Sequence, residues 1–394
     1  MNKKIISILM STAMGITVLT GCGSAPATTT DSNVAETATE TIEADVSADS
    51  SSSQKTAGVI WYSFADTYTA NAKQSLDNIS AADGTIKVID ADTQNDLTIQ
   101  DNNISNFFTQ NVDYLLLQNI NHKATSEIVN RCKEQGVTTL FVGTVSPSDD
   151  DFANYENLWY VSSASEQSGM NMGNAISDYF NNNADWDRNG NGKVDFILLQ
   201  GLQTSSDTIN RSSYSLEAIE KAGYELGTCI GGDDVTGVKG GDTINGVICD
   251  YQRAKAQENV EALLANFGKD IDCIIADNDD EALGAIAALR AHGYLTDESN
   301  YIPVVGVDAT APGCEALKDG TLLETSLNDP VALAKASYKL MWLLENGQEV
   351  TTETLGIDGA VVKGHRILLN YTSITKDNLQ DAEYDLNDVD ININ

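Results

Sequence analysis

Short apolar runs alternate with amphipathic stretches along the chain from about residue 57 onward. The apolar runs occupy residues 57–63, 86–91, 113–120, 138–144, 158–163, 194–201, 272–279, 302–309 and 322–327. Most of them are continuous rather than alternating, which is typical of parallel strands that are buried on both faces. Helical periodicity marks several of the intervening stretches, including 124–135, 166–180, 250–267 and 281–292. This β-α alternation predicts parallel sheets with right-handed crossovers.

A single sheet built from so many strands would be unusually large, so the pattern predicts two doubly wound α/β lobes. Each expected lobe is discontinuous in sequence, with 57–163 plus 329–362 in the first and 164–328 plus 363–385 in the second. The chain would then cross between the lobes three times, near Ser163, Asn328 and Val362. These crossings predict a three-strand hinge beneath an inter-lobe cleft.

The first residues have the layout of an export signal. Two lysines precede an apolar run that is too short, and too interrupted by Ser and Thr, to predict a membrane span. The run ends in Leu-Thr-Gly-Cys, which resembles the bacterial lipoprotein signal in which the Cys, here Cys22, becomes lipidated. We therefore expect a cleaved signal over 1–21 and a flexible tether over 22–56 that holds the protein at the extracytoplasmic face of the cell membrane. The alternative is a secreted protein in which Cys22 has no such role.

The composition argues against several other classes of protein. A formal net charge of −35 opposes binding to nucleic-acid phosphates. The six cysteines include Cys22, which leaves an odd number without a C-x-x-C motif, so neither a zinc knuckle nor a disulfide scaffold is indicated. A bridge between Cys229 and Cys249 stays open. The three histidines have no convincing nucleophile or metal partner near them in the sequence, so a hydrolytic triad has little support.

Polar residues gather where the predicted strands end. These positions are 63–66, 90–92, 118–121, 201–207, 277–280, Asp308 and Asn328. Ligands of parallel α/β sheets bind beyond the carboxyl ends of the strands. Carboxylates and amides at such positions in both halves of the chain therefore predict a polar cleft between two lobes, where ligand sites are common.

Residues 187–195 match the first nine positions of a calcium-binding EF-hand loop. The oxygen ligands would come from the main-chain carbonyl of Lys193 and from the side chains of Asp187, Asn189, Asn191 and Asp195. Gly192 permits the sharp turn, but position twelve is Leu198 rather than a bidentate Glu. We expect Asp272, at the start of a predicted strand, to complete a structural Ca²⁺ site. The alternative is a turn that is simply rich in Asp and Asn.

These motifs resemble those of the periplasmic glucose/galactose-binding proteins of ABC transporters, over roughly residues 57–380. In that family an acidic residue completes the calcium loop from the start of the strand that ends in A-N-N-D, and here that strand runs from Asp272 to Asp279. The resemblance implies the type 1 periplasmic binding protein fold and a monosaccharide ligand, galactose- or glucose-like. It also implies an ABC transporter permease as partner and a monomeric protein that is not an enzyme.

The resemblance further implies a set of sugar-binding residues. They are Asp66, Tyr68, Asp207, Arg211, Asn278, Asp308 and Asn328. Their chemistry suits a sugar, because carboxylates accept hydrogen bonds from hydroxyls, amides both donate and accept, and Arg presents a planar fork of donors. An aromatic ring covers the apolar face of a pyranose.

The chain departs from the family at several pocket positions. Where the family has an Asn, a His and the first amide of A-N-N-D, this chain has Gly143, Ser205 and Asp277. The second stacking Trp is absent, with Cys249 or Tyr251 near its place. These differences leave the identity of the sugar open. Candidates for compensating contacts are Gln203, Ser205 and Tyr251.

Simpler explanations exist for individual residues. Asp207 and Arg211 are four apart and would form an ordinary helical ion pair. Asp66 and Asp308 would cap helices, and Tyr68 would pack in a core.

Three other functions are also open. One is a binding protein for another small solute, such as ribose, a nucleoside or a sugar-like signal. The second is an extracellular glycosidase, which needs two carboxylates flanking the scissile bond, such as Asp66 and Asp308. The third is a sugar-responsive repressor, which the export signal and the absence of a basic DNA-binding region disfavour.

Overall fold

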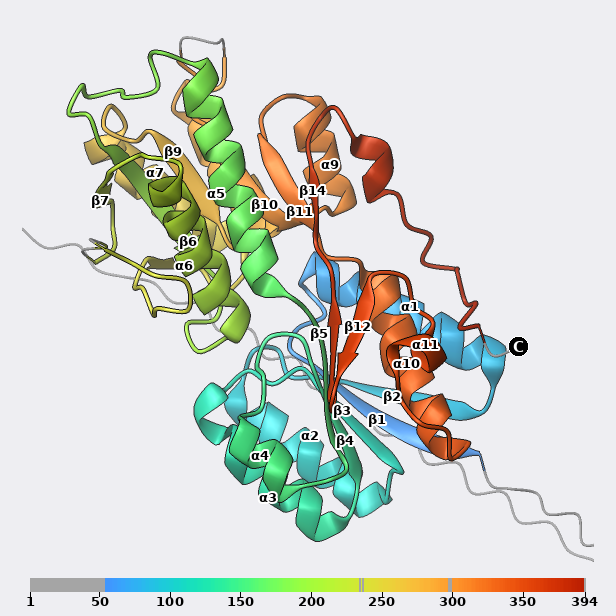
Figure 1. Cartoon of the computed structure of the whole chain (residues 1–394). Coiled ribbons are helices and arrows are strands. Elements are labelled where there is room, and N and C mark those ends of the chain that lie inside the picture. Colours follow the sequence, from blue (N-terminus) through green and yellow to red (C-terminus); the bar gives the residue numbers. More distant parts are fainter. Residues whose placement is uncertain (1–53, 234, 236, 297–299, 393–394) are drawn as a thin grey trace, which may run out of the picture. The chain divides into compact units, whose positions relative to one another are not determined.

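Two mainly parallel sheets organise the computed structural model, which describes residues 54–233, 235, 237–296 and 300–392 (Figure 1). The expected export signal, Cys22 and nearly all of the expected tether lie outside these residues. Every apolar run that was predicted to be a strand forms one, and the intervening stretches form helices. The predicted α/β class with two parallel-sheet lobes is confirmed.

The first lobe is built on a seven-stranded sheet with the order β12-β13-β5-β4-β3-β1-β2. Its strands are β1 (Lys55–Trp61), β2 (Ile86–Asp92), β3 (Tyr114–Leu117), β4 (Thr138–Val142), β5 (Leu158–Ser163), β12 (Ala360–Lys363) and β13 (Arg366–Leu369). Its helices are α1 (Thr67–Asp83), α2 (Leu97–Gln110), α3 (Thr125–Gln135), α4 (Asp149–Asn154), α10 (Pro330–Glu345) and α11 (Thr352–Leu355), with the short turn η1 (His122–Ala124). Val59 of β1 packs with α1 and α10, whereas its neighbour Ile60 packs with α2 and α3. Both faces of the sheet are therefore buried, which explains the continuous apolar runs.

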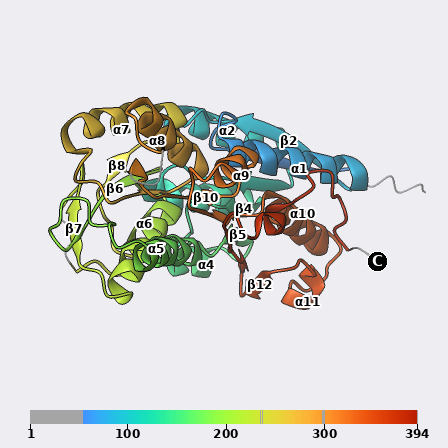
Figure 2. The same cartoon turned by 90° about the horizontal axis from the view of Figure 1, so that it is seen from above.

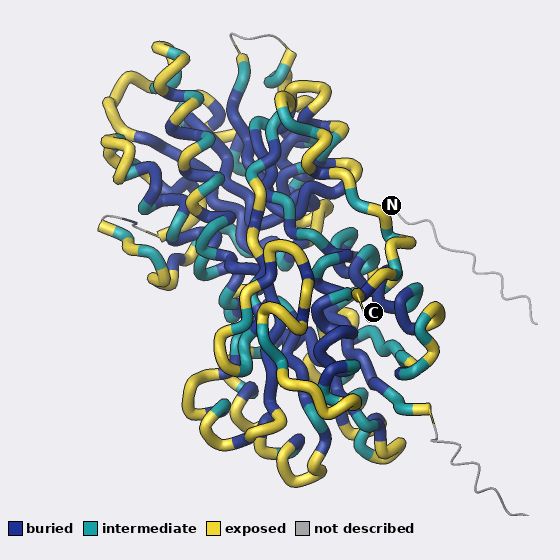
Figure 3. Tube along the Cα trace, turned by 45° about the vertical axis from the view of Figure 1, so that its right-hand side comes forward, coloured by how far each residue is buried: buried dark blue, intermediate teal, exposed yellow. Residues whose placement is uncertain are grey.

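The second lobe repeats this plan on a sheet with the order β14-β11-β10-β9-β6-β7, with β8 beside β6. Its strands are β6 (Val194–Gln200), β7 (Leu226–Cys229), β8 (Val247–Ile248), β9 (Cys273–Ala276), β10 (Val304–Asp308), β11 (Glu324–Leu327) and β14 (Thr372–Ile374). Its helices are α5 (Ser165–Asn182), α6 (Ser206–Lys221), α7 (Arg253–Phe267), α8 (Asp279–Ala291) and α9 (Ala311–Lys318), with the short turn η3 (Leu379–Ala382). Figure 2 shows α5 and α6 on one side of this sheet and α7 and α8 on the other. The buried strands of both lobes are dark in Figure 3.

One expected crossing between the lobes lies at a different place. Residues 363–369 were expected in the second lobe, but β13 pairs in parallel with β5, and Leu369 lies opposite Ser163. The chain therefore leaves the first lobe after Leu369 rather than near Val362. The reason is local, because β12 and β13 form a tight antiparallel hairpin that extends the first sheet by two short strands.

The last residues form a strap (residues 383–392) that passes from the second lobe to the first. Ala382, just before the strap, packs in the core of the second lobe, whereas Ile391 is only 3% exposed in the core of the first. The strap's polar contacts with the first lobe include Asn71 to the Tyr384 hydroxyl at 3.1 Å, Asn78 to the Leu386 carbonyl at 2.9 Å and Lys335 to Asp388 at 2.6 Å. The strap is thus attached to the first lobe by these contacts, while most of its polar side chains remain exposed.

Shortening Ile391 to Ala should destabilise the protein by about 2 kcal/mol, the low end for a buried aliphatic side chain. Such a loss lowers the melting temperature by roughly 2–4 °C per kcal/mol in a protein of this size class. Differential scanning calorimetry measures it. Val361→Ala, at an aliphatic side chain that is 40% exposed, is the control and should leave the melting temperature nearly unchanged. Equal melting curves for Ile391→Ala and wild type would show that the strap does not support the first lobe.

Candidate functional site

A polar cavity lies between the two lobes, with an empty volume of about 450 Å³ that includes adjoining open solvent. All the residues predicted to bind a sugar line it: Asp66, Tyr68, Asp207, Arg211, Asn278, Asp308 and Asn328. Residues absent from that prediction also line it: Tyr62, Thr69, Gln118, Thr144, Ser162, Ser163, Leu333 and Tyr371. The cavity thus collects side chains from the ends of strands in both lobes, as expected for parallel α/β sheets.

On the side of the first lobe, Asp66 both caps a helix and lines the cavity. Its Oδ1 accepts a hydrogen bond from the main-chain N–H of Thr69 at 2.7 Å, as the N-cap of α1. Its Oδ2 lies 3.5 Å from the Asn278 amide nitrogen of the other lobe. Burial raises the pKa of Asp66 to about 6, against the hydrogen bonds from Thr69 that lower it. Asp66 therefore caps α1 and also lines the cavity, so the capping explanation does not exclude a role in ligand binding.

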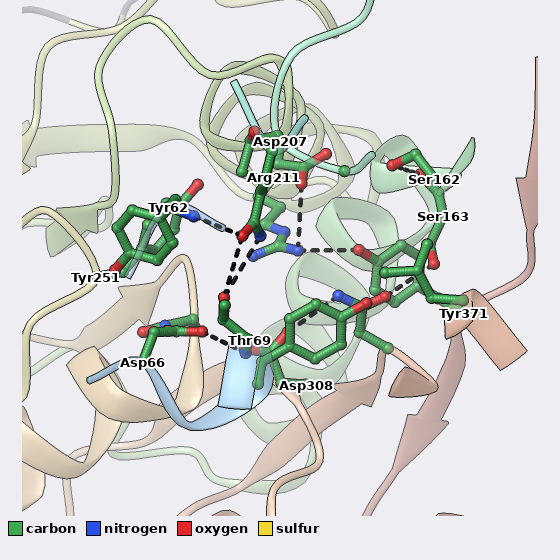
Figure 4. A pocket seen from close by; sticks show the side chains of 17 residues that line it. Tyr62, Asp66, Thr69, Ser162, Ser163, Asp207, Arg211, Tyr251, Asp308 and Tyr371 are labelled. Carbon is green, nitrogen blue, oxygen red and sulfur yellow. Dashed lines mark hydrogen bonds and ion pairs between the residues drawn. The ribbon is translucent and has the colours of Figure 1, made fainter. Parts of the chain in front are cut away.

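On the side of the second lobe, Arg211 is buried and already oriented by other groups (Figure 4). Its Nη1 donates to the main-chain carbonyl of Asp277 at 2.7 Å, and its Nη2 donates to the Tyr371 hydroxyl at 2.9 Å. The Asp207 carboxylate lies 3.8 Å from Nη2, and burial raises its pKa against the opposing charge of Arg211. Within the described part of the chain, Asp207 Oδ1 and Arg211 Nε have no hydrogen-bond partner. Buried polar atoms without partners are costly, so a bound molecule would satisfy them.

Asp308 occupies a strained position where β10 ends. Its φ is 111° and that of Ala309 is 49°, values that non-glycine residues rarely adopt. Asn328 donates to Asp308 Oδ1 at 3.2 Å and accepts from the Ser163 hydroxyl at 2.8 Å. Burial raises the pKa of Asp308 well above its ordinary value. Hydrogen bonds thus connect this carboxyl with two of the crossings between the lobes.

The lobes touch on both sides of the cavity. On one side, the Ser206 N–H and the Ser205 hydroxyl both donate to the Thr144 carbonyl at 2.8 Å. On the other, the Thr67 hydroxyl donates to Asp280 Oδ2 at 2.9 Å. The described form is therefore closed around the cavity.

The residues that depart from the family pattern have distinct positions. Gly143 and Tyr251 line the cavity, whereas Cys249 is buried without lining it. Ser205 caps α6 and contacts the first lobe, and Asp277 accepts from the Gly201 N–H at 3.3 Å. Gln203, one of the candidates for a compensating contact, is exposed and donates to Asn245, away from the cavity lining.

In the predicted calcium loop, carboxylates accept hydrogen bonds from main-chain N–H groups. Asp187 accepts from the N–H groups of Gly190 and Gly192 at 2.8 and 2.7 Å. Asp272 accepts from the N–H groups of Arg188 and Asp195 at 2.8 Å each. The strand start that carries Asp272 therefore does contact the loop.

The oxygen-rich donor set of this loop suits a hard cation. No Lys or Arg side chain pairs with Asp187, Asp195 or Asp272 in the described residues. The amide nitrogens of Asn189 and Asn191 both donate to Asp195 Oδ2 at 2.7 Å. Amides are uncharged, so these hydrogen bonds do not neutralise the carboxylate of Asp195. In the structure, the three carboxylates accept hydrogen bonds from N–H groups instead of converging on a common centre. The described residues contain no compact group of acidic, His or Cys side chains that could hold a metal.

The remaining cysteines do not pair. Cys132, Cys229, Cys249, Cys273 and Cys314 are free thiols, so the bridge between Cys229 and Cys249 that the sequence left open is not formed. Among the described helices, none combines the length and the apolar composition that a membrane crossing requires.

Two α/β lobes closed on one polar cavity define a protein that encloses a small solute. The chain belongs to the family of the periplasmic binding protein domain, whose sequence profile matches residues 57–349. The D-galactose/methyl-galactoside binding periplasmic protein of Haemophilus influenzae is 27% identical over 325 residues, which cover 82% of this chain and 90% of that protein. The xylitol-binding protein of Mycolicibacterium smegmatis is 25% identical over 79% of this chain and 78% of its own length.

Solved structures agree with the fold. An ABC transporter solute-binding protein of Bacillus halodurans with bound myo-inositol superimposes with a TM-score of 0.65 and 24% identity, covering 83% of this chain and 96% of that one. The predicted family is therefore confirmed, and with it the expectation that the protein is a solute-binding component of ABC transport rather than an enzyme. The glycosidase and repressor alternatives are set aside.

Proposed function

We propose that this protein is a lipid-anchored, monomeric receptor that binds one monosaccharide or cyclic polyol in the inter-lobe cavity and presents it to an ABC permease. The observation that carries the proposal is the pair of buried atoms Asp207 Oδ1 and Arg211 Nε, which have no partner among the described residues and belong to side chains that line the inter-lobe cavity. An acceptor and a donor of this kind match the hydroxyls of a polyol.

The composition of the cavity also favours a neutral, hydroxyl-rich ligand. Three carboxylates face one guanidinium, which is a poor environment for an anionic solute but a good one for hydroxyl donors. Tyr rings and Leu333 supply apolar surface for the carbon skeleton. The sugar and polyol ligands named for the relatives belong to the same chemical class. A nucleoside or another sugar-like signal is the second candidate, because the lining does not single out one ring.

Closure is the proposed activity. Hinge closure around a ligand is the known behaviour of periplasmic binding proteins. Ligand that contacts both lobes would shift the protein toward the closed form, which the permease would then recognise. Two features of the proposal rest on sequence: lipidation at Cys22 and a structural Ca²⁺ held by residues 187–195 with Asp272.

A ligand panel tests the proposal. Protein freed of co-purified solutes is titrated by calorimetry with D-galactose, D-glucose, D-ribose, D-xylose, xylitol and myo-inositol. We expect one of them to bind with a dissociation constant of about 1 μM, or about −8 kcal/mol. Absence of binding across this panel, together with binding of a nucleoside, would replace the sugar with the second candidate.

A further inference from the structure

Glu281 is a fully buried acid whose side chain forms its hydrogen bond outside its own helix. It is the third residue of α8, and its N–H donates to the Asn278 side chain that caps this helix, at 2.9 Å. An acid at this place commonly turns back to the main-chain N–H of the capping residue. Here Oε1 instead accepts from the main-chain N–H of Tyr251 at 3.0 Å, and Oε2 has no partner among the described residues. Helix capping therefore does not account for a carboxyl buried in this way.

Tyr251 is held from three sides in a conformation that it would not adopt alone. Asp250 and Tyr251 have φ values of 52° and 58°, in the left-handed region. A Cβ on Gly201 would lie 1.9 Å from the Tyr251 ring, so the ring packs directly on that backbone. The Tyr251 hydroxyl lies 2.8 Å from the Thr208 hydroxyl of α6. The third contact is the hydrogen bond from the Tyr251 main-chain N–H to Glu281.

This ring also stands where the lobes meet. Tyr251 lines the cavity, and its ring lies 6.0 Å from that of Tyr62 of the first lobe at an angle of 74°, an edge-to-face contact (Figure 4). The Tyr62 hydroxyl is 3.4 Å from the Asp250 carbonyl. Ile120 and Leu202 complete a small apolar cluster with these two rings, and each lobe contributes two of its members.

We propose that Glu281 is a positioning residue for the binding cleft, which fixes the left-handed main chain at Tyr251 so that its ring is preset to meet the ligand and Tyr62. The proposal rests on the proposed function for its effect on affinity, but not for its effect on Tyr251 itself. Burial raises the pKa of Glu281 well above its ordinary value, and nearby Asp277 adds to this effect. Gln places a carbonyl oxygen where Oε1 accepts from the Tyr251 N–H, so it keeps this acceptor.

The test compares Glu281→Met with Glu281→Gln. Met keeps the length of the side chain but has no strong acceptor, whereas Gln keeps the carbonyl oxygen. In ligand-free protein, hydrogen–deuterium exchange of peptides containing Tyr251 should rise about 10-fold in Glu281→Met and stay near wild type in Glu281→Gln. The dissociation constant for the sugar identified in the panel should also rise about 10-fold with Met and be restored with Gln.

Glu324→Met is the matched control. Glu324 is equally buried in the same lobe, at the end of β11 that is far from Asn328. Among the described residues, one of its carboxylate oxygens has no partner and the other accepts from the Ser326 and Ser373 hydroxyls. Its substitution should lower stability without changing exchange at Tyr251 or the dissociation constant. Wild-type exchange at Tyr251 in Glu281→Met would overturn the proposal, whether or not any sugar of the panel binds.

Binding measurements on double variants test independently whether Glu281 acts through the Tyr251 ring. In a Tyr251→Ala background, Glu281→Met should weaken binding no further, because residues that act through one another are not additive. Gly201→Ala displaces the ring from the opposite side and should weaken binding by a similar factor with Glu281 intact. Additive losses in the double variant, or unchanged affinity in Gly201→Ala, would show that Tyr251 is not the route by which Glu281 acts.

Discussion

Asp308→Asn should weaken binding of the sugar by about 100-fold or more while the protein remains folded. The Asp308 carboxyl is buried, lines the cavity and is held in place by Asn328 at 3.2 Å. Hydrogen bonds to a charged group contribute about 1.5–3 kcal/mol each, so losing one or two such acceptors produces a change of this size. Asn has the same shape as Asp and tolerates a positive φ better than most residues, which protects the strained turn. Asp308→Ala, which removes the polar group altogether, should abolish binding.

Calorimetric titration of the purified variants measures the effect. Asp319→Asn is the control, because Asp319 ends α9 on the surface of the same lobe and its side chain is 67% exposed. It should bind like wild type. If Asp308→Asn also bound like wild type, the ligand would lie outside the cavity described here, even though the predicted residues meet there.

The longer strands were predictable because their burial is visible in the sequence. A run such as 196–199 is continuously apolar since both faces of β6 are covered, and all of β6 is buried. The strands that sequence reasoning missed are β7, β8 and β12 to β14, which have two to four residues each. In such short segments the pairing partner decides the structure, and the partner of β13 lies about two hundred residues away in β5.

The cavity was predictable to the extent that its residues follow strands. Asp66, Asp308 and Asn328 each come after a recognisable apolar run, so the geometry of parallel sheets brings them together. Gln118 lies in a polar strand end that was noted, but nothing in its type distinguishes it from a loop amide. Tyr371 was missed because it follows β13, a strand that the sequence did not indicate. Its hydrogen bond to Arg211 is a purely tertiary contact.

Addition of Ca²⁺ to metal-stripped protein should raise its melting temperature by about 10 °C at about 1 mM Ca²⁺. An ion that binds the folded form with a dissociation constant of about 1 μM would stabilise it by about 4 kcal/mol under these conditions, and each kcal/mol corresponds to roughly 2–4 °C. The reason lies in the loop over 187–195, where carboxylates and amide groups gather without a basic side chain paired to them. Mg²⁺ should give a smaller shift, since it demands a tighter octahedral shell.

Asp272→Ala should remove this response, because Asp272 comes from another part of the chain and accepts hydrogen bonds from the loop's N–H groups at Arg188 and Asp195. Asp270→Ala, two residues earlier and outside these hydrogen bonds, should respond like wild type. Sugar affinity should change little in either variant, since the loop lies where β6 and β9 begin and the cavity lies where the strands end. Melting curves that coincide in Ca²⁺ and in chelator would leave residues 187–195 as a turn held only by its own hydrogen bonds.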